Sequence, residues 1–290
     1  MLESSTRWFG KINDCFDSKE EECEMNILFE IKMSKPYRFL KSLYYYIFKY
    51  RRRNKEIFNN AEGLNSNYSH LRKYRDLHFG KRCFIVATGP SLTTEDLELI
   101  KNEYTIGVNA LCKKFPEMGW KTTYFVISDA EAYNKLKPFL NEQNISFFGG
   151  HSDEIGDKNC IVIPKDIHNN YMWRNSKKVF WKNIEIAVGN GNTVVLNAIQ
   201  IAAYMGFKEI YLLGTDCNYR LKSEKLYFVD HGIRSSVQYS AGIRMIEDYK
   251  AIKRFTDAWG IKVFNATRGG MLEVFERVDL SRVLNVREKS

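Results

Sequence analysis

The chain has 290 residues, of which 44% are hydrophobic, so it is long enough to bury a sizeable core and is not a small disulfide scaffold. Its 44 Lys and Arg against 35 Asp and Glu leave a net charge of +9, and 27% charged residues are typical of a folded protein rather than a disordered one. The positive surplus suits nucleic acid, anionic lipid or phosphorylated small molecules, and its location must decide among them.

The six cysteines are scattered, without CxxC pairs and without a histidine at zinc-ligand spacing. We interpret them as free thiols in a reducing compartment. Residues 1–10 have no continuous apolar core, so they do not resemble a secretory signal or a transit peptide. Polar residues interrupt the apolar window 184–205, which falls short of the roughly 20 apolar residues of a membrane span. We therefore expect a cytoplasmic protein.

Residues 32–55 carry basic residues and no acidic one, and they follow an acidic cluster within 14–24. Aromatic and aliphatic residues are interleaved with the basic ones. This pattern is typical of an amphipathic helix on an anionic membrane surface, and it would place the protein peripherally on the inner face of the cell membrane. A helix that packs on the domain with a solvated basic face would show the same pattern.

Residues 59–70 are polar and rich in turn-forming residues, which predicts a linker. We therefore expect two parts. The first, 1–73, is a helical, basic and aromatic N-terminal arm with its linker. The second, 74–290, is a nucleotide-binding catalytic domain.

Short apolar runs alternate with helical patterns after the linker. Runs with the composition of strands are Arg82–Ala87, Tyr104–Val108, Thr123–Ser128, Ile161–Ile163, Ile184–Val188, Glu209–Leu213 and Lys262–Asn265. Helices are expected after the capping-box pair Thr93 and Asp96, over Thr193–Met205 and over Ser240–Trp259. Strands separated by such helices form parallel crossovers, so the predicted fold class is α/β, with an open, mostly parallel sheet and helices on both faces.

Ligands of an open parallel sheet bind beyond the carboxyl ends of its strands, where helix N-termini point free N–H groups. The loops with small or polar residues at this edge are Thr88–Ser91, Val108–Ala110, Gly189–Thr193 and Gly214–Asp216. Gly89 and Gly191 permit close approach of the backbone to a phosphate. Ser91 and Thr193 add hydroxyl groups, and Asn109 offers a donor and an acceptor. Together these loops predict a nucleotide site, although each one alone is also compatible with a tight turn.

Familiar nucleotide motifs are incomplete. Val194 stands where the third glycine of GxGxxG would follow Gly189 and Gly191, so an NAD fingerprint is not complete. The sequence has no GxxxxGK[ST] motif and no DxD pair that would chelate a metal around a sugar-nucleotide diphosphate. We expect no metal ligands and no tightly bound cofactor.

His231 is the best candidate for a general base. It lies in a polar segment, 230–236, between the last strand of the crevice and a long helix, and a neutral imidazole can take a proton from an attacking hydroxyl. A surface histidine beside Asp230 is the alternative. Tyr219 and Tyr227 flank this segment and either donate hydrogen bonds to a departing phosphate or simply pack. The cations available to neutralise that phosphate are Lys222, Lys225, Arg234 and Arg268.

Five segments, taken in order, closely resemble the bacterial and archaeal MptE-like family between Gly80 and Leu284. They are KRCFIVATGPSL, TIGVNAL, TTYFVISD, GNTVVLNAIQIAAYMGFKEIYLLGTD and GIKVFNATRGGMLEVFERVDL. The family includes archaeal enzymes that transfer diphosphate from ATP to 6-hydroxymethyl-dihydropterin. Its Rossmann-like fold is similar to that of the small bacterial sialyltransferases, which use CMP-sialic acid without a metal.

The resemblance to the sialyltransferases implies roles for individual residues. That group has a Gly-Pro-Ser loop, an Asn after the second strand, a helix start with Ser or Thr, a strand that ends in Gly-x-Asp, nearby tyrosines and a histidine base. The implied donor-binding positions are Gly89, Pro90, Ser91, Asn109, Ser128, Asp129, Gly191, Asn192, Thr193, Gly214 and Asp216. The implied catalytic positions are His231, Tyr219 and Tyr227.

We favour a metal-independent, inverting glycosyltransferase with a CMP-sugar donor in cell-surface polysaccharide or glycan biosynthesis. The arm favours this function, because a pterin kinase acts on soluble substrates and has no use for a membrane-surface helix. One alternative is an MptE-like diphosphokinase that uses ATP and Mg. The other is a non-catalytic nucleotide-binding protein of a glycan assembly system. The expected partners are the nucleotide-sugar, a glycan acceptor on a lipid carrier and an anionic membrane through 32–55, with no nucleic acid; an oligomer is left open.

Overall fold

The computed structural model describes residues 51–64, 68–140, 145–149, 160–166, 178–219, 227–229 and 239–285. The chain divides into two compact units, Met1–Arg52 and Arg53–Ser290. Residues 32–50 of the expected membrane arm lie outside the described residues. Everything that follows concerns the second unit.

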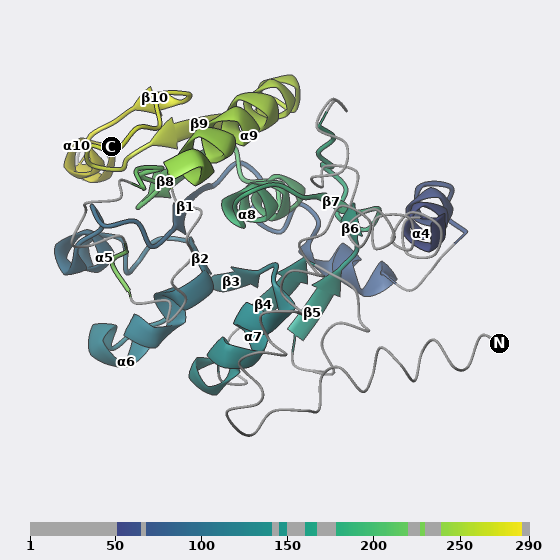
Figure 1. Cartoon of the computed structure of the whole chain (residues 1–290), viewed down its shortest axis with the longest axis horizontal. Helices are drawn as coiled ribbons and strands as arrows, with labels where there is room; N and C mark the ends of the chain where they lie inside the picture. The colour runs from purple at the N-terminus through teal and green to yellow at the C-terminus, as the bar shows by residue number, and fades with distance from the viewer. Residues whose placement is uncertain are drawn as a thin grey trace, which may run out of the picture. The chain divides into compact units, whose positions relative to one another are not determined.

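The second unit is built on a sheet of eight parallel strands in the order β10-β9-β8-β1-β2-β3-β4-β5 (Figure 1). The strands are β1 (Arg82–Val86), β2 (Thr105–Val108), β3 (Tyr124–Ile127), β4 (Ile145–Gly149), β5 (Cys160–Ile163), β8 (Glu209–Leu213), β9 (Lys262–Asn265) and β10 (Glu276–Arg277). The central strand β1 is buried at every position, as expected of a parallel strand that is covered on both faces. The prediction of an open, mostly parallel α/β sheet is confirmed.

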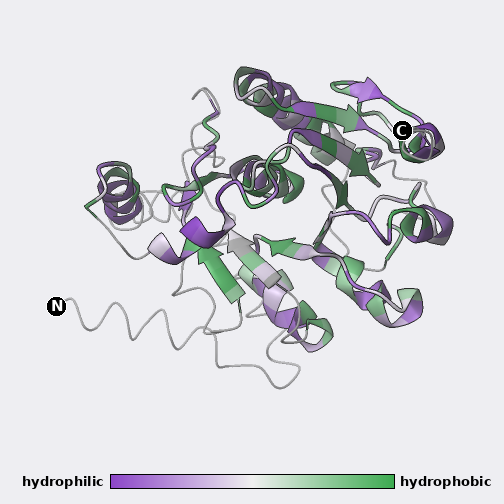
Figure 2. Ribbon diagram, turned by 180° about the vertical axis from the view of Figure 1, so that it is seen from behind, coloured by the Kyte–Doolittle hydropathy of each residue, from purple (hydrophilic) through white to green (hydrophobic). Residues whose placement is uncertain are grey.

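Helices cover both faces of this sheet, and their apolar sides turn inward (Figure 2). One face packs against α8, α9 and η2, and the other packs against α5, η3, α6, α7 and α10. The helices are α4 (Arg51–Ala61), η2 (Ser69–Tyr74), α5 (Thr94–Leu99), η3 (Asn109–Lys114), α6 (Phe115–Met118), α7 (Ala130–Leu136), η4 (Lys137–Phe139), α8 (Val195–Tyr204), α9 (Tyr239–Ala258) and α10 (Leu280–Asn285). The capping box predicted for α5 is present, with Thr93 and Asp96 bonded to each other's backbone N–H groups.

Helix α8 lies in the interior, and every one of its residues is buried. A helix that is apolar on all sides is expected in the core of a large domain. Its two polar residues, Asn197 and Gln200, therefore need internal hydrogen-bond partners, which they find in β7. In the part of the chain that the structure describes, no helix has the length and apolar character that a membrane span requires.

The segment 184–188 differs from the expected strand. Residues 184–186 form a turn, and only Val188–Gly189 (β7) is extended, paired in a separate small sheet with β6 (Lys165–Asp166). The side chain of Gln200 bonds both the N–H and the C=O of Gly189, at 2.7 and 3.0 Å, in place of a second strand. The apolar composition of 184–188 thus reflects burial beside α8 rather than membership of the main sheet.

The segment expected as a linker, 59–70, also differs. Helix α4 continues to Ala61, and Tyr68 is buried in the main core together with Leu71 and Tyr74 of η2. The core of the second unit therefore begins before the expected boundary at residue 74. The mostly polar composition of 59–70 predicted a linker, because composition does not show that the single residue Tyr68 is buried in the core. The described cysteines, Cys83, Cys112, Cys160 and Cys217, are free and buried.

Candidate functional site

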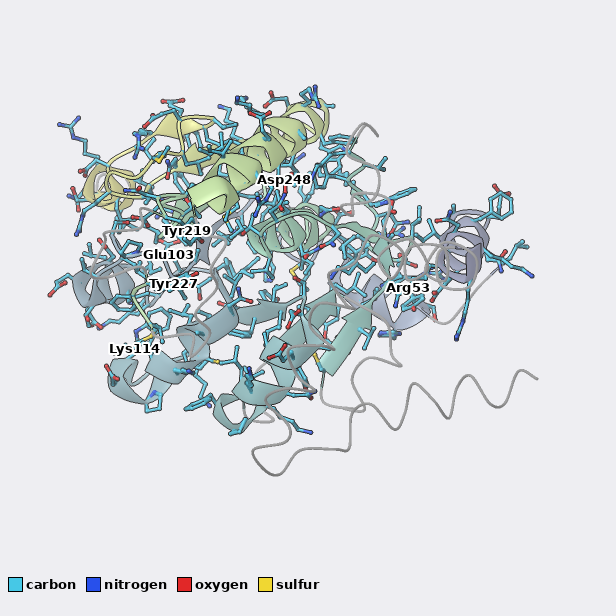
Figure 3. The ribbon with its side chains drawn as sticks, in the orientation of Figure 1. Arg53, Glu103, Lys114, Tyr219, Tyr227 and Asp248 are labelled. Atoms are coloured by element: carbon cyan, nitrogen blue, oxygen red, sulfur yellow. The ribbon has the colours of Figure 1, made fainter. Side chains whose placement is uncertain are left out.

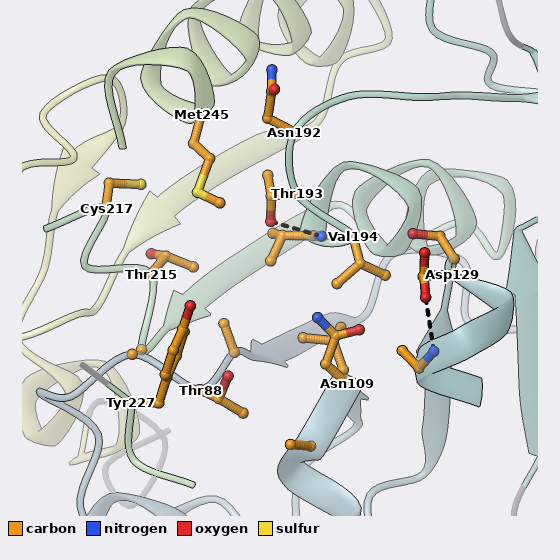
Figure 4. A pocket seen from close by; sticks show the side chains of 18 of the residues that line it. Thr88, Asn109, Asp129, Asn192, Thr193, Val194, Thr215, Cys217, Tyr227 and Met245 are labelled. Atoms are coloured by element: carbon orange, nitrogen blue, oxygen red, sulfur yellow. Dashed lines mark hydrogen bonds between the residues drawn. The ribbon is translucent and has the colours of Figure 1, made fainter. Parts of the chain in front are cut away.

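A cavity of about 570 Å³ opens at the carboxyl edge of the sheet (Figure 4). All four loops singled out in the sequence contribute to its wall. The volume lies within the usual range for small-molecule sites, and the position is the one at which open parallel sheets bind their ligands. The cavity is therefore the candidate binding site of this protein.

The loops after β1 and β8 are joined by a buried carboxylate. Asp216 accepts hydrogen bonds from the backbone N–H of Ser91 at 3.2 Å and from its hydroxyl at 2.8 Å. A side chain at position 89 would overlap the carboxylate of Asp216 and the carbonyl of Gly214, so this position requires glycine. Burial raises the pKa of Asp216, and the hydrogen bonds from Ser91 partly offset that effect. The contact between the two loops gives this wall of the cavity a defined shape.

Asn109 follows β2 and faces the cavity with an unusual backbone conformation. Its φ of 50° lies in the left-handed region, which asparagine tolerates better than most residues but which still costs about 1–3 kcal/mol. Strained conformations of this kind concentrate at functional sites. The backbone conformation makes Asn109 a candidate for contact with a ligand in the cavity.

The loop before α8 is fixed from behind by α9. Asp248, which is buried, accepts hydrogen bonds from the backbone N–H of Asn192 at 2.6 Å and from its side-chain amide at 2.7 Å, and it also forms an ion pair with Lys178. Gly191 packs so closely against Leu196 and Asp248 that an added Cβ would clash with both. The loop is rigid enough to present the first amides of α8 to the cavity.

A helix start and two lysines line one part of the cavity, beside the carboxylates of Asp129, Glu131 and Asp216. Helix α8 begins at Val195, whose N–H donates to the hydroxyl of Thr193 at 3.3 Å, and the positive end of its dipole faces the cavity. Lys113 and Lys165 also line the wall, and the ammonium of Lys165 donates to the carbonyl of Ser128 at 2.7 Å. This combination of a helix start and lysines suits an anionic ligand such as a phosphate.

Two tyrosines close one side of the cavity. Tyr219 and Tyr227 pack edge to face, with their ring centroids 5.9 Å apart (Figure 3). Burial raises the pKa of both hydroxyls. Both groups therefore stay protonated at neutral pH, and because the hydroxyl of Tyr219 donates a hydrogen bond to that of Tyr227, the proton of Tyr227 is the one directed to a ligand in the proposal below.

Most of the predicted donor-binding residues line the cavity. Those that do are Gly89, Pro90, Asn109, Ser128, Asp129, Gly191, Asn192, Thr193, Gly214 and Asp216. Ser91 does not line it, because its hydroxyl is directed to Asp216. Asp129 lines it and also caps α7 by accepting a hydrogen bond from Ala132 N–H at 2.7 Å.

Some of the predicted groups are not placed at the site. His231, Asp230, Lys222, Lys225 and Arg234 lie outside the described residues. Arg268 is described, but it is not part of the cavity wall, and it pairs with the buried carboxylate of Asp96. The interpretation of Arg268 as a phosphate-neutralising cation is therefore corrected, since its charge is used to hold α5.

Three lysines at the site were missed in the sequence. Lys113, Lys135 and Lys165 line the cavity from η3, α7 and β6. Lys165 follows Pro164 directly after the apolar strand β5, and this position after a strand was the one available signal. Lys113 and Lys135 stand within helices, and only the fold turns them to the same cavity. No group of His, Cys, Asp or Glu side chains within the described ranges is arranged to hold a metal ion.

The sheet order and the cavity define a Rossmann-like α/β protein with a candidate binding cavity at the carboxyl edge of its sheet. The chain belongs to the family described as 6-hydroxymethylpterin diphosphokinase MptE-like, which it matches over residues 54–222. The resemblance predicted from the sequence is thereby confirmed.

Solved structures also show similarity to this chain. The chain is similar to the MAf glycosyltransferase from Magnetospirillum magneticum AMB-1, with 17% sequence identity and a TM-score of 0.47. The similarity covers 74% of this chain and 37% of that one, so the chain spans well under half of that protein's length. No curated protein matches the sequence.

Proposed function

We propose that the protein is a transferase that binds a nucleotide donor in the carboxyl-edge cavity, and that the donor is a CMP-sugar. The observation that carries this proposal is the pairing of two features in one wall. The side-chain amide of Asn109 suits the edge of a base or sugar, and the dipole at the start of α8 with Lys165 suits phosphate. A nucleotide is the common ligand class that needs both.

In the proposed reaction an acceptor hydroxyl attacks the anomeric carbon of the donor sugar and displaces CMP with inversion. His231 takes the proton of that hydroxyl, and CMP leaves with the negative charge that develops on its phosphate. The amides at the start of α8, together with the protonated hydroxyl of Tyr227, which accepts a hydrogen bond from Tyr219, stabilise this charge. The acceptor is a cell-surface glycan or its lipid-linked precursor.

The family description supports a second candidate, a diphosphokinase that transfers diphosphate from ATP to a hydroxymethylpterin. The same wall would then hold a triphosphate, and the lysines would bind its outer phosphates. The two candidates differ in the nucleotide and in the need for magnesium, so a binding experiment separates them.

We expect CMP to raise the melting temperature of the protein in the presence of EDTA. A ligand that binds only the folded state stabilises it by roughly 2.7 kcal/mol at a concentration of 100 times its Kd, which corresponds to several degrees for a domain of this size. The measurement is a thermal-shift series with CMP, CMP-sialic acid, UDP-sugars, GDP-sugars, ATP and hydroxymethylpterin. The same series for Asn109→Ala should show a smaller shift with CMP.

The control for Asn109→Ala is Gly119→Asn. Gly119 also has a left-handed backbone conformation, and it has open space for a side chain, so this variant places an asparagine of the same backbone type away from the cavity. This variant should keep the full shift with CMP. A shift with ATP plus magnesium but none with CMP would favour the diphosphokinase instead. If none of the nucleotides raises the melting temperature, both candidate functions are contradicted.

We further propose that residues 32–55 bind an anionic membrane surface. In the full chain, replacing Arg38, Lys41 and Lys49 with glutamine should lower co-sedimentation with vesicles that contain phosphatidylglycerol, because each basic residue near such a surface contributes about 1 kcal/mol. Added salt should have the same effect, since screening acts over roughly 8–10 Å. A chain shortened to Tyr74 would be a poor test, since Leu71 belongs to the core. If the glutamine variant sediments with these vesicles as strongly as the native chain, the arm does not bind the membrane through its basic residues.

A further inference from the structure

The amino edge of the sheet, opposite the cavity, carries two neighbouring lysines. Lys81 and Lys208 directly precede the neighbouring strands β1 and β8. A backbone hydrogen bond of 2.9 Å joins them, from Lys208 N–H to the carbonyl of Lys81, and the register places their side chains on the same face of the sheet. Lys262 of β9 is in register with Glu209, so its side chain lies on the other face.

Large apolar side chains stand exposed beside this pair of lysines. Phe79 is 68% exposed, Leu77 is 53% exposed and Tyr104 is 38% exposed. The ammonium of Lys208 lies 5.6 Å from the centre of the Phe79 ring, so the apolar group and this lysine belong to one surface. We call the five residues Leu77, Phe79, Lys81, Tyr104 and Lys208 the amino-edge surface.

The backbone that carries these apolar groups is firmly held. His78 donates its N–H to the carbonyl of Met205 at 2.8 Å, and its ring bonds the hydroxyl of Tyr124 at 2.6 Å and stacks on Phe207. Its ring also lies 4.3 Å from that of Tyr104. The exposure of Leu77 and Phe79 is therefore a fixed feature of the fold and not the fraying of a loop.

The positive charge of the surface is not neutralised within the second unit. Glu103 is engaged by Arg82, and Glu209 accepts a hydrogen bond from Tyr211. Among the described residues, no carboxylate lies within ion-pair distance of Lys81 or Lys208. Exposed aromatic and aliphatic groups set among uncompensated lysines mark an interaction site rather than ordinary surface.

We propose that the amino-edge surface binds an anionic phospholipid membrane. A soluble polyanion would use the lysines but would leave Phe79 and Leu77 in water, whereas the headgroup layer accepts both kinds of side chain. The lysines then contact lipid phosphates while the apolar groups enter the boundary with the acyl chains. Because the cavity lies at the opposite edge of the sheet, this orientation leaves it open to the aqueous side. The proposal does not depend on which nucleotide the cavity binds.

The test is co-sedimentation of the full chain with vesicles of phosphatidylcholine, alone or mixed with an equal part of phosphatidylglycerol. We expect preference for the anionic vesicles, and we expect the double variant Lys81→Glu and Lys208→Glu to lower the partition coefficient by roughly tenfold or more. The double variant Leu77→Ser and Phe79→Ser should also lower it. Because residues 32–55 are the same in every variant, any contribution from them cancels.

Matched controls keep the test specific. Lys182→Glu with Lys250→Glu makes the same change in charge at exposed positions on other elements, and Ile243→Ser with Met271→Ser removes exposed apolar groups elsewhere. Both controls should partition like the native chain, and all variants should keep its melting temperature. The proposal fails if the amino-edge variants partition like their controls. It also fails if the surface binds heparin through the same lysines while Phe79 and Leu77 have no effect on vesicle binding, because the partner would then be a soluble polyanion.

Discussion

His231→Ala should lower turnover by roughly 10²- to 10⁴-fold, the usual contribution of a positioned general base, while nucleotide affinity changes little. Turnover and nucleotide affinity should respond differently because different parts of the site are proposed to serve them. The wall that would hold the nucleotide is made by the loops after β1, β2 and β8 and by the start of α8, and none of these contains His231. The loss should therefore appear in the rate and not in the binding of CMP. Turnover with the identified donor and a CMP thermal shift are measured on the same preparation.

The matched control for this experiment is His70→Ala. His70 is exposed in η2 and does not line the cavity, so this variant should keep native turnover. The native rate should also rise with pH through the range near 6.5 in which a histidine loses its proton, and this rise should disappear in His231→Ala. If His231→Ala keeps its turnover and its pH profile, another group such as His168 or Asp230 must be the base.

Gly89→Ala should destabilise the protein by roughly 1–3 kcal/mol or more and should abolish the CMP shift, because one added methyl group overlaps two fixed groups. The methyl would meet the carboxylate of Asp216 and the backbone carbonyl of Gly214, and the carbonyl has no freedom to rotate away. To relieve this overlap, the loops after β1 and β8 would have to move apart, which would break the hydrogen bonds from Ser91 to Asp216. Chemical denaturation measures the first effect and nucleotide titration the second.

Gly149→Ala is the matched control for this prediction. Gly149 also lies at the carboxyl end of a strand, but an added Cβ there would come no closer than 3.4 Å to its nearest neighbour, Asn197. That separation is ordinary contact, so this variant should lose little stability and keep the CMP shift. Equal behaviour of the two variants would show that the contact between the β1 and β8 loops does not shape the site.

Much of the site was predictable because it depends on local rules. The apolar runs at β1, β2, β3, β8 and β9 have the composition of buried strands, and parallel strands place their carboxyl ends at one edge. It follows that residues directly after different strands meet in space, however far apart they lie in the chain. Asn109 and Asp216 were found by this rule.

Other features depend on contacts that the sequence does not display. Ser91 has the residue type of a phosphate ligand, but its hydroxyl is used by Asp216. Gly191 resembles part of a phosphate loop, but it is required by packing on Leu196 and Asp248. Residue type alone does not distinguish a ligand contact from an internal one, because the same chemistry serves both.

The sequence by itself determined the α/β class, the places of strands β1, β2, β3, β5, β8 and β9 along the chain, the family and the edge at which the cavity opens, since each of these follows from short-range periodicity and from motifs. The tertiary structure decided how the two edges of the sheet are used. It turned Lys113, Lys135 and Lys165 to the cavity, directed Arg268 away to Asp96 and set Phe79 beside the lysines of the opposite edge. These outcomes depend on side chains brought together from distant elements, and only the packing of helices on both faces of the sheet brings them together.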